Sequence, residues 1–364
     1  MYFSPSKTNR KMQNINIKAL LYSYFIKYDK LRELTSEAFS GSDSNQLRVY
    51  IDAYDILRFI YNRSLLGPDG IFESSSNVLT SALLNLVAHI RAFYAGSDYH
   101  VETEFYIVFS DMPRSADIYC HNVHFDKIID ANLKMLRVLC PFIPGVYLLE
   151  RTVDPSVVIT TDIIQHIEAK FDCPSIIISR DLNMWQIPCH FSNVAVFRPR
   201  KGQSGDSSFC VNQRNVLSVY RDHRKLTKTI LEGIITPGML PLYIAMTSSP
   251  ELNLPMYYSA QKAIDILKKL VEQNKIINGY NSPDAISGVL NTIGIHVGLM
   301  EARPTSLYIR YKSIDVMSKA ILYKTKPESA YIHAVQLADP RGVEQINETY
   351  FKDNPIDIIH LFYR

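Results

Sequence analysis

The sequence lacks the long apolar runs that membrane proteins need. No stretch approaches the ~18 consecutive apolar residues of a bilayer span, and residues 1–13 carry no apolar signal core. Tryptophan is nearly absent, with 1 residue, whereas tyrosine is common, with 23 residues. These absences predict a protein that does not use a membrane as a partner and that resides in the cytoplasm.

Cysteine pairing and strong net charge are lacking as well. The five cysteines are odd in number and none stands in a Cys-x-x-Cys spacing, which indicates free, mostly buried thiols in a reducing compartment. The net charge of +3 permits nucleic-acid binding but does not argue for it. Composition therefore leaves several classes of soluble protein open.

Apolar runs alternate with helical patterns through the middle of the chain. Strands are predicted at 47–52, 105–109, 175–179 and 194–197, and helices at 77–95, 127–138 and 154–171. The alternation predicts an α/β fold with a central, mostly parallel sheet flanked by helices. We expect residues 1–46 to form a helical extension and linker, 47–211 the α/β domain, and 212–364 a mainly helical region.

Two of the predicted strands lead directly into aspartates. The first ends in Asp52, and the buried run Ile176–Ile178 is followed by Ser179-Arg180-Asp181. Open α/β sheets bind ligands at the carboxyl ends of their strands, so both carboxylates are candidates for a site. An aspartate after a strand is also a common helix cap or turn residue, and this second interpretation stays open.

The segment Ser179–Ile187 resembles the Ser-x-Asp-x-Asp-x-x-Gln-Leu motif of the 5′-nuclease family. This family includes flap endonucleases, phage 5′-3′ exonucleases and phage-type RNase H. The segment Ile51–Leu57 is similar to the Asp-x-x-Asn/Asp-Leu pattern that closes the family's first strand. The order of elements extends the resemblance over about residues 47–270. It implies a PIN-like sheet followed by a degenerate helix-hairpin-helix-like element.

The resemblance implies a metal-dependent chemistry at the strand ends. Members of the family cleave phosphodiesters with divalent metals held by carboxylates, so Mg²⁺ or Mn²⁺ is the expected cofactor of an active enzyme. By this resemblance Asp52 and Asp181 are the candidate catalytic residues. The candidate metal ligands are Asp52, Asp111, Asp162 and Asp181.

The chain departs from the family pattern where the chemistry is most demanding. Asn183 stands at the second aspartate of the motif, and Leu252 falls where the family has another acid. Amide oxygens are poor replacements for carboxylates around hard cations, which leaves at most one good metal site. Residues 256–260 replace the hairpin glycines that allow a backbone to approach a phosphate.

Basic residues follow the fourth predicted strand and recur in the helical region. The candidates for binding DNA or an RNA–DNA hybrid are Arg198, Arg200, Lys201, Arg224, Lys225 and Lys262. Basic runs of this density are as often the solvated face of a helix. The sequence does not decide between the two interpretations.

Three hypotheses follow. The first is an active 5′-nuclease with a reduced metal site, acting on branched DNA or RNA–DNA. The second is a pseudoenzyme that keeps the fold and binds nucleic acid or a larger assembly. The third is a structural subunit whose N-terminal helix docks on a protein partner. The depleted acids favour the second and third hypotheses over the first. Such divergence suits a phage or other viral protein, for which the expected location is the host cytoplasm.

Overall fold

The computed structural model describes a set of segments that includes the sheet and the helices around it. The described residues are 32, 36, 45–64, 73–96, 101–110, 123–170, 173–198, 209–224, 236–247, 258–272, 311, 315–326, 338–351 and 355–362. Most of the predicted N-terminal extension lies outside these residues, as does Asp111.

A six-stranded sheet forms the centre of the molecule, with strand order β3-β2-β1-β4-β5-β6. Its strands are β1 (Gln46–Asp52), β2 (Glu102–Ser110), β3 (Val146–Arg151), β4 (Ser175–Ile178), β5 (Val194–Arg198) and β6 (Phe209–Val211). The first five strands are parallel and β6 pairs antiparallel with β5. The mostly parallel α/β sheet expected from the sequence is therefore confirmed.

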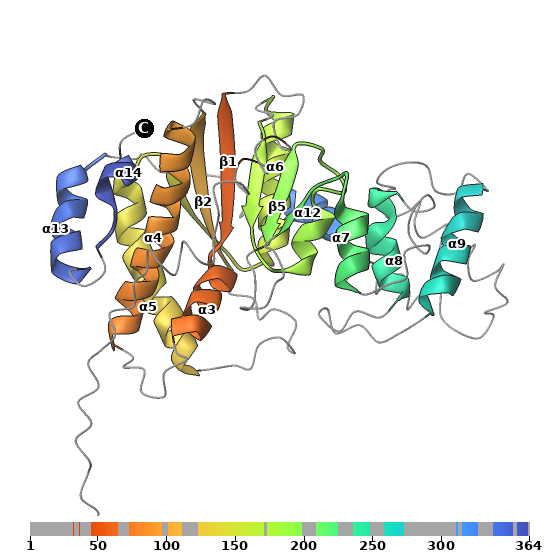
Figure 1. Ribbon diagram of the computed structural model, residues 1–364, viewed down its shortest axis with the longest axis horizontal. Coiled ribbons are helices and arrows are strands. Elements are labelled where there is room, and N and C mark those ends of the chain that lie inside the picture. The colour runs from red at the N-terminus through yellow and green to blue at the C-terminus, as the bar shows by residue number, and fades with distance from the viewer. Residues whose placement is uncertain are drawn as a thin grey trace, which may run out of the picture.

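The two faces of the sheet support separate apolar cores, because side chains alternate along each strand. Val49 and Ile51 of β1 face one core, whereas Tyr50 faces the other. The first core lies under α3 (Ala53–Ser64), α4 (Glu73–Ala95) and α5 (Val123–Leu139). The second core lies under α6 (Pro155–Glu168) and the 3₁₀ turn η2 (Leu182–Gln186). Helices thus cover both faces, as Figure 1 shows.

Helix α6 begins where the sequence predicts it. Asp154 is its N-cap, and the carboxylate accepts a hydrogen bond from the Ser156 backbone N–H at 2.8 Å. Pro155 occupies the first helical position, where its missing N–H costs nothing. This cap fixes the start of the helix that covers the sheet beside β1.

The helical region after the sheet extends outward from β5. It contains α7 (Val216–His223), the 3₁₀ turn η3 (Pro237–Met239), α8 (Leu240–Met246) and α9 (Ala260–Glu272). In Figure 1 α7, α8 and α9 follow one another away from the sheet. Helices α8 and α9 contact each other at the place of the expected hairpin-like element, whose loop residues 248–257 lie outside the described part.

The last helices return to the α/β layers instead of extending the helical region. They are α12 (Val316–Lys324), α13 (Pro340–Tyr350) and α14 (Ile358–Phe362). Helix α12 packs against α6, while α14 packs against α4 on the opposite side of the sheet. Buried Val343, Phe351 and Leu361 belong to the same core as α4. The predicted boundary at residue 212 stays a prediction, and both cores extend across it.

The composition raised two questions that the described residues address: the state of the cysteines and the presence of membrane-spanning helices. Cys140, Cys173, Cys189 and Cys210 are buried free thiols, as expected, and burial raises the pKa of the Cys140 thiol to about 12. In this part of the chain, no helix has both the length and the apolar character needed to cross a membrane.

Candidate functional site

The candidate site lies where β1 and β4 end side by side. The two strands are parallel, and Ile51 is paired with Ile178, so Asp52 and Ser179 are the next residues at the same edge of the sheet. The Ser179 backbone N–H donates to the Phe197 carbonyl of β5 at 3.1 Å, which continues the sheet by one residue. The two predicted strand-end motifs therefore meet in space.

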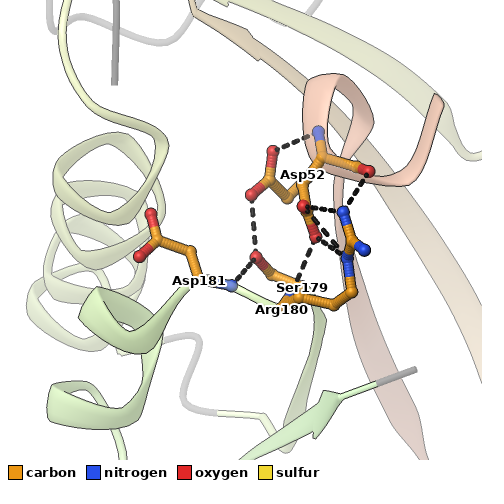
Figure 2. A network of polar contacts seen from close by, with 5 residues as sticks. Asp52, Ser179, Arg180 and Asp181 are labelled. Atoms are coloured by element: carbon orange, nitrogen blue, oxygen red, sulfur yellow. Dashed lines mark hydrogen bonds and ion pairs between the residues drawn. The ribbon is translucent and has the colours of Figure 1, made fainter. Parts of the chain in front are cut away.

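Asp52 is fully buried and both its carboxylate oxygens accept hydrogen bonds from the protein. Oδ2 accepts from the Ser179 hydroxyl at 2.8 Å, and Oδ1 accepts from the Asp55 backbone N–H at 3.3 Å. The second bond satisfies an N–H in the first turn of α3, so Asp52 acts as a helix cap as well as a strand-end carboxylate. Figure 2 shows the Asp52 carboxylate and the Ser179 hydroxyl directed toward each other.

A second buried carboxylate, Asp55, is held by Arg180. Its Oδ2 accepts the Arg180 backbone N–H at 2.8 Å. Its Oδ1 accepts from guanidinium Nη2 at 2.8 Å and from Nε at 3.2 Å. The Asp55 side chain is 1% exposed and that of Arg180 is 18% exposed. A buried carboxylate needs such compensation, and a guanidinium with two donors in one plane supplies it well.

Asp181 caps the turn that carries the rest of the motif. Its Oδ1 accepts from the Asn183 backbone N–H at 2.9 Å, and its own backbone N–H donates to the Ser179 hydroxyl at 3.1 Å. Figure 2 shows its carboxylate beside the network formed by Asp52, Ser179 and Arg180, with the Ser179 oxygen between them. The capping interpretation of Asp181 is thus met by the geometry, and its role as a metal ligand stays a prediction.

Two polar residues that follow Asp181 make hydrogen bonds within η2 and to the start of α12. Asn183 Oδ1 accepts from Gln186 Nε2 at 3.4 Å. Gln186 is 1% exposed, and its Oε1 accepts from the Val316 backbone N–H at 3.3 Å, at the start of α12. The glutamine of the motif therefore connects the strand-end turn to the C-terminal part of the chain.

Asp162 makes its described contacts beneath α6, toward the middle of β1. Its Oδ2 accepts from the Tyr50 hydroxyl at 2.6 Å and lies 3.3 Å from His166 Nδ1. Burial first, and then the nearby Asp162, raise the pKa of the Tyr50 phenol well above its usual value, so this hydroxyl remains a donor. These contacts give Asp162 a structural role, in which it joins α6 to β1.

The described residues do not by themselves fit a metal centre. Among them, no three histidine, cysteine, aspartate or glutamate side chains are grouped closely enough to hold a metal ion. Asp111 follows β2, the neighbour of β1, but lies outside the described residues. The four-carboxylate set predicted from the family resemblance therefore stays a prediction.

Three of the predicted basic residues lie in the described part of the chain, on β5, after α7 and on α9. The Arg198 guanidinium carbon lies 5.4 Å from the ring centroid of buried Trp185. Lys262 is exposed on α9, with its ammonium 5.5 Å from the Tyr258 ring. Arg224 is half-buried at the end of α7. Arg200, Lys201 and Lys225 lie outside the described part of the chain.

The Asp55–Arg180 pair is a feature of the site that was not predicted from the sequence. Arg180 is the unspecified position of the Ser-x-Asp motif, and Asp55 lies one helical turn after Asp52. The sequence did indicate that Asp55 would need a partner. An aspartate amid the apolar residues of α3 needs a cation or several hydrogen-bond donors if that face of the helix is buried. The partner could not be named, since 125 residues separate the two.

Comparison with known proteins gives similarity to solved structures alone. No protein-family model and no curated protein matches the chain. The chain is similar to the 5′-exonuclease of bacteriophage T5, solved with bound zinc, with a TM-score of 0.45 and 9% identity over 86% of this chain and 99% of the other. It is also similar to a flap endonuclease of the same phage, solved with DNA and metal ions, with a TM-score of 0.44 and 9% identity over 85% of this chain and 99% of the other.

Proposed function

We propose that this chain is a nuclease-like α/β protein that binds nucleic acid beside the ends of β1, β4 and β5 and has a depleted metal site. One observation carries the proposal. The carboxylates of Asp52 and Asp55 are buried and bonded to Ser179, Arg180 and backbone N–H groups, which is an arrangement for holding structure. Asn183 adds a neutral amide where the family motif has a further acid.

The distribution of basic residues supports binding to a phosphate backbone. Arg198 ends β5, next to the strand that carries the Ser179–Asp181 segment. Arg224 caps the end of α7 and Lys262 lies on α9, two of the helices that extend away from the sheet in Figure 1. Contacts between basic side chains and phosphates depend on charge and not on base sequence. We therefore expect binding that is independent of nucleic-acid sequence and that weakens as the salt concentration rises.

An active nuclease is the second candidate, and one observation favours it. Asp52 ends β1, and Asp181 follows the end of the adjacent parallel strand β4, at the edge where such sheets bind ligands. With Asp111 as a third carboxylate, this pair would hold one Mg²⁺ or Mn²⁺, which would supply charge stabilisation and a water of lowered pKa. In that case the chain's own contribution is to position these carboxylates.

Cleavage and binding assays on a 5′-flap DNA and an RNA–DNA hybrid separate the candidates. Each substrate is incubated with the protein in EDTA, in Mg²⁺ and in Mn²⁺. The variant is Asp181→Ala, and the matched control is Asp130→Ala, which removes an exposed aspartate of α5. We expect binding in all three conditions, no cleavage, and affinity that falls with salt and with Lys262→Ala.

Other outcomes would replace the proposal. Metal-dependent cleavage that Asp181→Ala abolishes and Asp130→Ala preserves would establish an active nuclease. Failure to bind either substrate at low salt would favour the structural-subunit hypothesis, in which the predicted N-terminal helix docks on a protein partner.

A further inference from the structure

At the strand ends, a buried carboxylate is paired with a cation that belongs to the chain, the Arg180 guanidinium. Both carboxylate oxygens of Asp55 accept from Arg180. Oδ1 accepts from guanidinium Nη2 at 2.8 Å, and Oδ2 accepts from the backbone N–H at 2.8 Å and from Nε at 3.3 Å. The Asp52 carboxylate is adjacent, since its Oδ1 accepts the N–H of Asp55 itself. Asp52 and Asp55 are both fully buried. Two buried carboxylates therefore share one corner of the sheet, where Arg180 contributes a positive charge.

We propose that Arg180 is the resident cation of this corner, and that its guanidinium makes the fold independent of divalent metal by occupying the Asp55 carboxylate. The inference concerns folding and metal affinity, so it does not depend on whether the protein binds nucleic acid. It predicts that removing Arg180 turns the Asp52–Asp55 corner into a site for a hard divalent cation.

The physical argument rests on competition for the same oxygens. A hard cation such as Mg²⁺ or Mn²⁺ binds through carboxylate oxygens, and those of Asp55 already accept the Arg180 donors. A divalent ion at Asp55 would also lie close to the guanidinium, and like charges repel strongly in a buried site. Without Arg180, two buried carboxylates would lack a cation, a state that is costly until a cation binds.

Thermal unfolding without nucleic acid tests the proposal directly. The wild type, Arg180→Gln and the double variant Asp55→Asn with Arg180→Gln are unfolded in EDTA and in millimolar Mn²⁺. We expect the same wild-type midpoint in both buffers. Arg180→Gln should unfold several degrees lower in EDTA and recover in Mn²⁺, because an ion that binds only the folded state stabilises it by mass action. The double variant should regain stability in EDTA and gain nothing from Mn²⁺.

Paramagnetic Mn²⁺ provides a second readout, since the free ion gives a resonance signal that binding removes. We expect Arg180→Gln to bind Mn²⁺ at least tenfold more tightly than the wild type. If Arg180→Gln does not fold, the wild type and the double variant still decide the matter. A wild-type midpoint that rises in Mn²⁺, with the rise lost in the double variant, would overturn the proposal. An Arg180→Gln protein as stable as the wild type in EDTA, or one that Mn²⁺ does not rescue, would overturn it as well.

Discussion

At the scale of single residues, the Tyr50–Asp162 contact predicts a measurable cost. The Tyr50 hydroxyl donates to Asp162 at 2.6 Å, and both side chains are buried. Tyr50→Phe removes the donor and leaves a buried carboxylate oxygen with one bond fewer. We expect the free energy of unfolding to fall by about 1–3 kcal/mol, measured by urea unfolding.

The matched control for this prediction is Tyr350→Phe, which removes a hydroxyl from a side chain that is 53% exposed. It should leave stability nearly unchanged. If Tyr50→Phe were equally neutral, the hydroxyl would not be what holds Asp162.

At the scale of elements, Gln186 predicts a coupling between the strand-end turn and α12. Its side chain accepts the Val316 N–H at the first residue of that helix. Gln186→Ala removes the acceptor and leaves a cavity at a buried position. We expect faster amide hydrogen exchange across α12 and a loss of stability of about 1–3 kcal/mol. Gln345→Ala, at an exposed position on α13, should change neither. Exchange that rises uniformly over the sheet would contradict a local coupling.

Elements also show why part of the fold could be predicted and part could not. Strands β1, β2, β4 and β5 carry apolar runs that are buried on both faces, so local composition identifies them. Strand β3 and the three-residue β6 were not predicted, since β3 has only two buried positions. Asp52 and Asp181 could be predicted at strand ends because each follows an apolar run, whereas the pairing of β1 with β4 comes from the structure. The partner of Asp55 could not be predicted, because it depends on which strands become neighbours.

At the scale of the whole molecule, one asparagine of α4 predicts how firmly the C-terminal part is attached. Asn85 donates to the Pro355 carbonyl at 3.2 Å and accepts from the Asp357 N–H at 2.8 Å. Asn85→Ala breaks both bonds, so we expect limited proteolysis to cut residues 355–362 faster. Asn85→Asp keeps the acceptor and should give an intermediate rate. Equal cutting rates in all three proteins would show that apolar packing alone holds this segment.

The attachment of α14 to α4 also constrains how the protein is made. Arg91 of α4 donates to the Pro144 carbonyl at 2.7 Å and to the Leu361 carbonyl, which lies 270 positions later in the chain. During synthesis, α4 and the first strands leave the ribosome long before Leu361 exists, and the apolar surface that α14 will cover stays exposed meanwhile. Chaperones that shield nascent chains have the longest opportunity to act at this surface, and stalled translation would leave it exposed to aggregation.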